Sequence, residues 1–274
     1  MSERPSLQPS IDAWTHSIEA ISELVAHLTE GEWNSRTECP GWSVRDIVSH
    51  VIGLESEALG DPRPIHTLPR DLYHVTDEIS RYMEVQVDVR RHHTGPEMTG
   101  ELEYTIIRRS RQLRNEKRAP DHVINSPVFG PMSLDLSLRR RVFDCWVHEQ
   151  DLRRALDEPG NLDSPAAEIA RDMMIEELPA AIADRAKIAP RSAVVFDVSG
   201  PLEFLRTVRV DEEGRGSVSS SPSLGPVATF TTDWETYARL ACGRMRRRRA
   251  AERLKIEGEP EITNRILANF SITP

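Results

Sequence analysis

The chain has 274 residues, of which 38% are hydrophobic, 5% aromatic and 29% charged. This composition excludes a disordered chain, and the length favours two domains over one. The net charge of −9 disfavours general nucleic-acid binding, because neutralising phosphates requires a basic surface. The apolar runs are too short to cross a membrane, the N-terminus lacks a secretory signal, and three scattered cysteines indicate no disulfide framework. We therefore expect a soluble, cytoplasmic protein with no membrane or nucleic-acid partner.

Most of the chain before residue 190 has the residue spacing of helices. Apolar residues recur every three or four positions over residues 11–30, which predicts the first helix. A second helix is expected to begin after Ser43, which forms a capping-box pattern with Asp46, and to end near Gly60. The remaining segments form two groups. Further helices are expected over residues 71–92, 98–117, 134–156 and 164–186. The proline-rich segments are predicted to be loops, at residues 61–70 and 119–133.

The sequence pattern changes near residue 190. Short β-branched segments bounded by turn residues predict strands at residues 193–200, 205–210, 216–221 and 227–233. Helices are expected at about residues 234–242 and 260–269. The predicted fold class is therefore mixed α and α/β: a four-helix bundle over residues 1–189, followed by a small α+β domain over residues 190–274.

A line of ionisable side chains marks the helix predicted over residues 134–156. Asp144 and His148 are four positions apart, so they lie on one helix face, and Asp151 follows three positions later. A carboxylate and an imidazole one turn apart can bind the same divalent cation. The same spacing also fits a solvent-exposed face on which Asp144 pairs with Arg141 or His148.

His50, on the apolar face of the second predicted helix, is a further candidate ligand. A lone histidine on such a face is commonly a hydrogen-bonded core residue, but helical bundles also combine such a histidine with an acid–histidine pair from another helix. His50, Asp144 and His148 would then form a two-histidine, one-carboxylate set with positions open for water or substrate. Trp42, directly before this helix, either lines the mouth of a pocket or packs in the core.

The neighbouring residues also allow more than one interpretation. Asp151 can orient a metal-bound histidine by accepting the proton of its second ring nitrogen, or it can pair with Arg153 or Arg154 at the surface. Cys145 is expected to be a buried packing residue. The basic run Arg244 to Arg249 suggests nucleic-acid binding, but it has no interleaved aromatic residues, so a solvated helix start is the simpler interpretation.

Two motifs resemble the mycothiol-dependent maleylpyruvate isomerase family. They are CPGWSVRDIVSH at residues 39–50 and RVFDCWVHEQDLRRAL at residues 141–156. The resemblance implies a DinB-like metal-binding bundle followed by a domain similar to sterol carrier proteins. It also implies a divalent cation, usually zinc, held by His50, Asp144 and His148. The family's characterised isomerase has glutamate where this chain has Asp144, which is shorter by one methylene.

The same resemblance implies a function. In the family, the metal activates the thiol of mycothiol, and the thiolate attacks an electrophilic small molecule, as in the cis–trans isomerisation of maleylpyruvate. A thiol transferase is equally open. An arginine of the second domain, for which Arg244 is the candidate, would hold an anionic substrate or the thiol. The alternatives are a hydrolase that uses metal-bound water and a non-enzymatic protein that binds a small ligand or a partner. We expect a monomer by default, with a dimer as the alternative.

Overall fold

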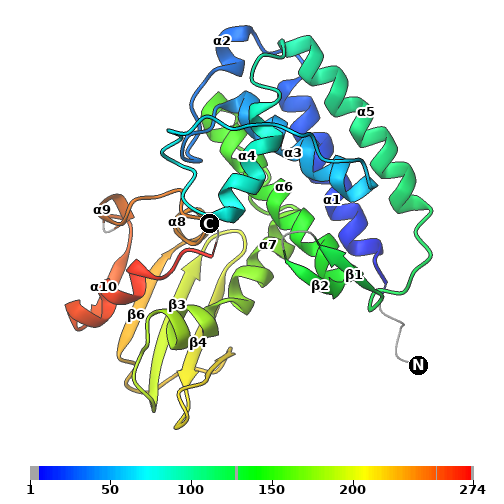
Figure 1. Cartoon of the computed structure of the whole chain (residues 1–274). Helices are drawn as coiled ribbons and strands as arrows, with labels where there is room; N and C mark the ends of the chain where they lie inside the picture. The colour runs from blue at the N-terminus through cyan, green and yellow to red at the C-terminus, as the bar shows by residue number, and fades with distance from the viewer. Residues whose placement is uncertain (1–5, 127–128, 251, 273–274) are drawn as a thin grey trace. The chain divides into compact units, whose positions relative to one another are not determined.

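The computed structural model describes residues 6–126, 129–250 and 252–272, without the side chains of residues 247 and 248. The chain divides into two compact units, Met1–Ile169 and Ala170–Pro274. The first unit is mainly helical, and the second contains a β-sheet with helices (Figure 1). The predicted mixed fold class, a helical region followed by a small sheet domain, is confirmed.

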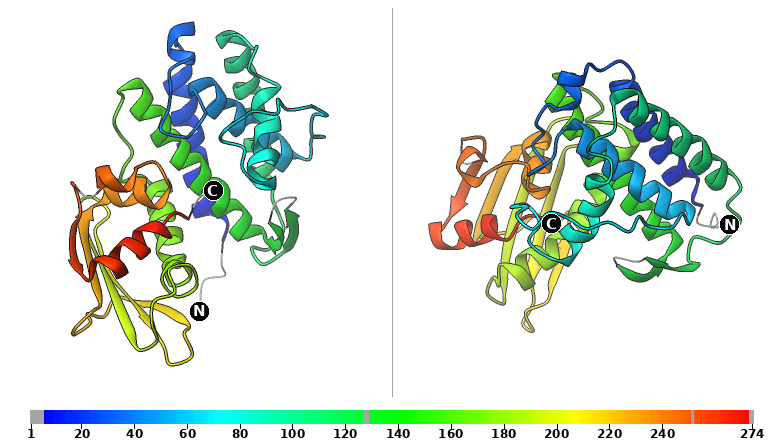
Figure 2. Two further views of the ribbon diagram at one scale, coloured as in Figure 1. Left: turned by 60° about the vertical axis from the view of Figure 1, so that its left-hand side comes forward. Right: turned by 45° about the horizontal axis from the view of Figure 1, so that its top comes forward.

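Long helices form the core of the first unit. They are α1(Gln8–Val25), α3(Val44–Leu59), α5(Gly95–Arg114) and α6(Leu134–Leu156). Helix α1 packs along α6 and α3 packs along α5, as the views in Figure 2 also show. Trp14, Ile47 and Leu102 are fully buried between these helices. The shorter helices α2(Glu30–Trp33) and α4(Glu78–Asp88) complete the unit. In the described parts of the chain, no helix is both long and apolar enough to cross a membrane.

The helices that carry the candidate ligands begin at capping residues. The Ser43 side chain accepts a hydrogen bond from the backbone N–H of Asp46, and the Asp46 carboxylate accepts one from the backbone N–H of Ser43. This capping box confirms the predicted start of α3. Ser133 caps α6, which covers the predicted range 134–156. Local sequence therefore fixes the starting points of both helices.

Two predicted segments of the first unit are wrong. The loop expected over residues 119–133 contains an antiparallel hairpin of β1(Val123–Ser126) and β2(Gly130–Ser133). The sequence pattern missed these strands because residues such as Gly130 and Pro131 are typical of a loop. The helix expected over residues 71–92 is shortened to α4, because Asp77 provides its N-cap.

The second unit is built on a five-stranded sheet with the order β5-β4-β3-β6-β7. The strands are β3(Ser192–Ser199), β4(Phe204–Val210), β5(Gly216–Ser219), β6(Ala228–Asp233) and β7(Lys255–Gly258). The central strands β3 and β6 are parallel, and the other neighbours are antiparallel. The four predicted strand segments are confirmed. Strand β7 was not predicted, because it is a short, largely exposed edge strand without an apolar run.

The core of the second unit lies between this sheet and the helices after it. These helices are α8(Trp234–Ala241), α9(Arg247–Ala250) and α10(Pro260–Ala268). The ring of Phe196 on β3 stacks with Phe230 on β6 and with Phe270 after α10, at centroid distances of 5.4 and 5.5 Å. Tyr237 of α8 meets Phe196 edge-on. These aromatic contacts join the sheet to the chain segments that cover it.

The division between the two units falls within α7(Pro165–Glu176), whereas the sequence pattern changes about twenty residues later. Helix α7 is followed by a short π-helical segment, η1(Ala180–Arg185), which packs against β4 and β5. These helical turns therefore have their contacts in the second unit, although their sequence looks like the preceding helices. The change of pattern marks the start of the sheet, and the domain limits 1–189 and 190–274 stay a prediction.

Candidate metal centre

Helix α3 carries one candidate ligand on its buried face. His50 lies two turns after the Ser43 cap and is 3% exposed. Its Nε2 atom is 3.3 Å from Oδ2 and 3.4 Å from Oδ1 of Asp144. Burial lowers the pKa of His50 despite the neighbouring carboxylate. The imidazole is therefore held in its neutral form, which is the form that binds metals.

Helix α6 carries two more candidate ligands. Asp144 and His148 lie one turn apart, and Nε2 of His148 is 3.6 Å from Oδ1 of Asp144. The His148 side chain is 6% exposed and that of Asp144 is 26% exposed. The interpretation of this stripe as a solvent-exposed face is therefore wrong, although the expected ion pair of Asp144 with Arg141 is present at 2.8 Å.

His50, Asp144 and His148 form one compact group, with one potential ligand atom from each lying within 4.8 Å of the others. Four tetrahedral ligands at zinc distances of about 2.0–2.1 Å are separated from one another by roughly 3.3 Å. The carboxylate–imidazole distances of 3.3 to 3.6 Å are close to that spacing and are long for direct hydrogen bonds. The two nitrogens and one oxygen therefore fit a divalent cation such as zinc.

Asp151 determines which nitrogen of His148 faces this group. Asp151 is fully buried, and its Oδ2 lies 3.1 Å from Nδ1 of His148. Because an ionised carboxylate only accepts hydrogen bonds, the ring proton lies on Nδ1, and Nε2 presents its lone pair toward Asp144. Metal-bound histidines commonly make this second hydrogen bond. Arg154 donates to the other Asp151 oxygen at 3.2 Å, so both contacts expected of Asp151 exist, but in the interior.

A chain of buried ion pairs lies behind Asp144. Arg141 donates to Oδ2 of Asp144 at 2.8 Å and to Oε1 of Glu55 at 2.9 Å. The Glu55 carboxylate is 1% exposed and also accepts hydrogen bonds from Trp14 at 3.0 Å and Arg109 at 3.1 Å. Burial alone would raise the pKa of both carboxyl groups, but the adjacent guanidinium groups hold the pKa of Glu55 below its ordinary value. The adjacent Arg141 guanidinium holds the pKa of Asp144 well below its ordinary value. Both groups are therefore carboxylates at neutral pH.

Trp42, which directly precedes the Ser43 cap, lies against both candidate histidines. Its ring centroid is 4.9 Å from that of His50 and 5.8 Å from that of His148. The two imidazole rings are 4.8 Å apart and meet edge-on. Of the two interpretations of Trp42, the structure favours a residue that lines the candidate site.

Glu55 is a buried charge that the sequence analysis did not identify. It ends the otherwise apolar run VIGLE of α3, at residues 51–55. An acidic residue in such a run indicates a buried carboxylate that needs a cationic partner. The sequence could not name that partner, because Arg109 and Arg141 come from two other helices.

Cys145 and Arg244 were expected to be a packing residue and a substrate-binding residue. Cys145 is fully buried, and burial raises the pKa of its thiol well above the ordinary value, as expected of a packing residue. Arg244 belongs to the second unit, where its side chain donates to the carbonyl of Cys242 at 2.8 Å. Its role toward a substrate stays a prediction. In the basic run Arg244 to Arg249, the side chains of residues 247 and 248 lie outside the described residues.

The first unit is thus a helical bundle with a candidate metal centre, and solved structures share the whole fold. One is the crystal structure of a mycothiol-dependent maleylpyruvate isomerase, and another is a mutant of that enzyme with a histidine changed to alanine. Each is 14% identical to this chain and superimposes with a TM-score of 0.57, and the alignment covers 94% of this chain and 96% of the solved chain. The sterol carrier protein domain 2 of Helicoverpa armigera covers 40% of this chain and 88% of that chain, with 22% identity and a TM-score of 0.30, which is too low to support a conclusion.

The family follows from the sequence of the first unit. The model of the mycothiol maleylpyruvate isomerase N-terminal domain matches residues 14–153, about half of the chain. The chain therefore belongs to the mycothiol-dependent maleylpyruvate isomerase family and is an enzyme of that family. The matched range contains His50, Asp144 and His148. A comparison with curated proteins found no significant match.

Proposed function

We propose that the protein is a metal-dependent enzyme that uses mycothiol to attack a small electrophilic molecule. The observation that carries this proposal is the group of His50, Asp144 and His148, in which two helices bring three potential ligand atoms within 4.8 Å. Membership of a mycothiol-dependent isomerase family supports the use of this thiol. When bound, a divalent cation would lower the pKa of a coordinated thiol, so that a thiolate forms at neutral pH.

Each residue of the group has a defined part in this proposal. His50 and His148 supply neutral nitrogen ligands, and Asp144 supplies an anionic oxygen. Asp151 keeps the proton of His148 on Nδ1, and Arg141 fixes Asp144 through Oδ2, while Oδ1 of Asp144 lies within 3.6 Å of Nε2 of both histidines. Three protein ligands leave a fourth position for the thiol, as in catalytic zinc sites. Zinc is the proposed metal because imidazole and carboxylate ligands suit it.

The proposed reaction is a reversible addition. The mycothiol thiolate forms a C–S bond with one carbon of the cis double bond of a maleylpyruvate-type substrate, and the electron pair of that double bond moves onto the conjugated carbonyl group. The former double bond is now single and rotates. Return of the electron pair breaks the C–S bond, restores the double bond in the trans form and releases the thiolate unchanged. If the adduct is protonated and released instead, the same site performs thiol transfer.

Three further assignments belong to this proposal. Arg244 would bind a carboxylate of the substrate or of the thiol, because the planar guanidinium matches two carboxylate oxygens. A cytoplasmic location is proposed because Cys39, Cys145 and Cys242 form no disulfide. A monomer is proposed as the default oligomeric state, and the substrate is proposed to be an electrophilic or anionic small molecule.

A metal-dependent hydrolase is the second candidate function. The same three ligands with an open position would activate a water molecule in place of a thiol. The two functions differ in their requirement for mycothiol, because the hydrolase needs only water as its nucleophile.

Turnover by metal-free and zinc-loaded protein, each with and without mycothiol, tests the proposal. We expect maleylpyruvate isomerisation only when zinc and mycothiol are both present, and a loss of at least about 100-fold in kcat/KM for Asp144→Asn. Asp135→Asn, in the first turn of the same helix, is the matched control and should retain the wild-type rate. Mycothiol-independent hydrolysis of an ester would favour the second candidate. Turnover that requires neither zinc nor mycothiol would contradict both.

A further inference from the structure

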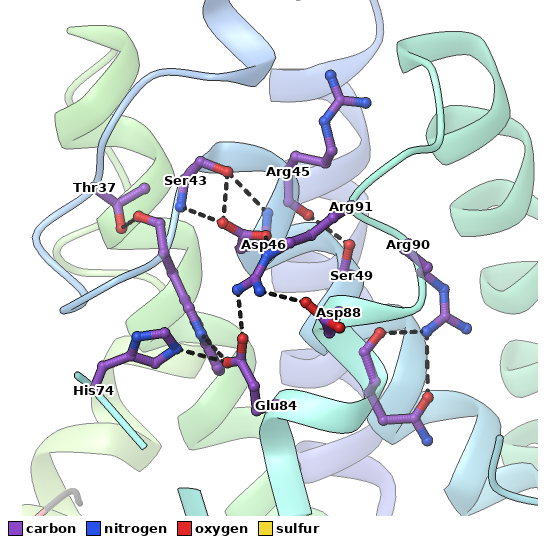
Figure 3. Close-up of polar contacts among 12 residues, drawn as sticks. Thr37, Ser43, Arg45, Asp46, Ser49, His74, Glu84, Asp88, Arg90 and Arg91 are labelled. Atoms are coloured by element: carbon purple, nitrogen blue, oxygen red, sulfur yellow. Dashed lines mark hydrogen bonds and ion pairs between the residues drawn. The ribbon is translucent and has the colours of Figure 1, made fainter. Parts of the chain in front are cut away.

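Helix α4 carries a buried carboxylate, that of Glu84, which is not one of the three candidate metal ligands. The Glu84 side chain is 1% exposed. Figure 3 shows it between His74 and Arg91, with Asp46 and Asp88 on the other side of Arg91. A carboxylate removed from water is costly unless charged and hydrogen-bonding partners compensate it. The partners of Glu84 therefore indicate what the residue holds in place.

Glu84 uses both of its oxygen atoms. Its Oε2 accepts a hydrogen bond from Nε1 of Trp42 at 2.9 Å and lies 2.9 Å from Nε2 of His74. Its Oε1 pairs with Arg91, which supplies the compensating positive charge. Because an ionised carboxylate only accepts hydrogen bonds, the ring proton of His74 lies on Nε2. Glu84 therefore links an arginine, a histidine and the Trp42 indole.

The indole that Glu84 holds is the one that lies against both candidate histidine ligands, at centroid distances of 4.9 and 5.8 Å. The backbone of Trp42 is held separately, because its carbonyl accepts hydrogen bonds from the side chain and the backbone N–H of Thr37 at 2.8 and 3.2 Å. Both ends of Trp42 are thus fixed, and only the end that contacts the histidines depends on Glu84.

We propose that Glu84 is a positioning residue, which holds the Trp42 indole against His50 and His148 as a fixed wall of the site. This inference rests on the proposed function. A wall in this place excludes water from one side of the imidazole pair and limits the directions from which the thiol and the substrate approach. A displacement of about 1 Å near reacting groups can lower a rate by about 100-fold. Loss of Glu84 would therefore impair the reaction without removing a metal ligand.

Four variants separate this role from a general contribution to stability. Glu84→Ala removes the acceptor for the indole, whereas Glu84→Gln keeps an oxygen that can accept the same hydrogen bond. Asp88→Asn is the matched control, because Asp88 also pairs with Arg91, at 2.5 Å. Trp42→Phe removes the indole and so shows how much Trp42 contributes to the fluorescence and to the turnover.

Quenching of tryptophan fluorescence by Co²⁺ is the first readout, because bound cobalt quenches a nearby indole most strongly. Subtracting the Trp42→Phe signal isolates the part due to Trp42. We expect Glu84→Ala to lose most of this part, to keep one bound cobalt, and to lower kcat/KM by about 10- to 100-fold. Glu84→Gln should recover part of both signals, and Asp88→Asn should match the wild type.

The outcomes distinguish failure of this inference from failure of the proposed function. Wild-type quenching and turnover in Glu84→Ala would overturn the role of Glu84 and leave the metal enzyme intact. Absence of cobalt binding by the wild type would refute the metal site and this role together. If Glu84→Ala does not fold, the effect of Glu84→Gln on kcat/KM is compared in the wild type and in Trp42→Phe. We expect this effect to disappear in Trp42→Phe, because it is transmitted through Trp42. An equal effect in both backgrounds would overturn the inference.

Discussion

Arg141 donates a hydrogen bond to Oδ2 of Asp144 at 2.8 Å, and the other oxygen of this carboxylate, Oδ1, lies 3.4 Å from Nε2 of His50 and 3.6 Å from Nε2 of His148. Arg141 therefore fixes the orientation of a carboxylate whose Oδ1 lies within 3.6 Å of both imidazole nitrogens. Arg141 is itself held by a hydrogen bond to the buried Glu55. The orientation of the Asp144 carboxylate therefore depends on Glu55, which is not a candidate ligand.

The first prediction concerns the stability that this buried chain provides. Glu55→Gln should lower the free energy of unfolding of the metal-free protein by about 3–5 kcal/mol, because it leaves Arg109 and Arg141 without their shared carboxylate. Urea unfolding measures the difference. Asp61→Asn is the control: its pair with Arg108 is screened by solvent, so its loss should lower the stability much less than Glu55→Gln does. Equal effects of the two variants would contradict the importance assigned to Glu55.

The contribution of Glu55 should also depend on pH. The pKa of Glu55 is lower in the folded protein than its ordinary value near 4.5. The stability gained from ionisation is therefore fully present above that ordinary value and is lost as the pH falls toward the folded-state pKa. The difference between wild type and Glu55→Gln should be largest at neutral pH and should shrink in acid. A difference that grows in acid would have the wrong sign.

The second prediction concerns the hydrogen bond between Asp151 and His148. Asp151→Ala should weaken zinc binding by about 10- to 100-fold, because His148 loses the acceptor that keeps its proton on Nδ1. Asp151→Asn should weaken binding less, since its amide oxygen can accept the same hydrogen bond. Competition with a chelator measures both affinities. Wild-type affinity in Asp151→Ala, with folding confirmed by circular dichroism, would exclude this role.

The sequence predicted the parts of the site that lie on single, well-capped helices. Helix α6 covers the range expected from its pattern, so Asp144, His148 and Asp151 were correctly placed on one face. The capping box at Ser43 fixed the start of α3 and therefore the depth of His50. Spacing within a helix is a local property, and the sequence is sufficient to infer it.

The contacts between helices were beyond the sequence. Glu55 and Glu84 are buried because arginines and tryptophans from distant segments reach them, and no local spacing reveals such pairings. The β1–β2 hairpin was missed because Gly130 and Pro131 are typical of a loop, and strand β7 because it is a short, largely exposed edge strand. The sequence therefore identified the candidate ligands His50, Asp144 and His148 but not the buried carboxylates Glu55 and Glu84 that lie around them.

The third prediction is that the protein's own buried thiols take no part in the reaction. Cys145 and Cys242 are 0% and 2% exposed, and burial raises the pKa of the Cys145 thiol. A Cys39→Ser variant should therefore react slowly with Ellman's reagent when folded and should expose two thiols in denaturant. It should also keep its mycothiol-dependent turnover. Rapid labelling of Cys145 in the folded protein would show that a reactive protein thiol lies beside Asp144.

The fourth prediction concerns the turn before α3. Gly41 has a φ of 82°, and an added Cβ would overlap the ring of His74. Gly41→Ala should cost roughly 1–2 kcal/mol from the backbone conformation alone, plus the displacement of His74 from Glu84. Gly100→Ala, where a Cβ meets no atom within 4 Å, is the control and should be neutral or slightly stabilising. Denaturant unfolding that shows equal stability for the two variants would contradict this account.

The metal content of purified protein reconstituted with Zn²⁺ tests the central claim most directly. The account predicts one zinc per chain in the wild type and loss of that zinc in both His50→Ala and His148→Ala. His66→Ala should keep it, because His66 pairs with Asp88 through a contact of 2.6 Å and is not one of the three proposed ligands. Stoichiometric zinc retained in both His50→Ala and His148→Ala would contradict the proposed metal centre.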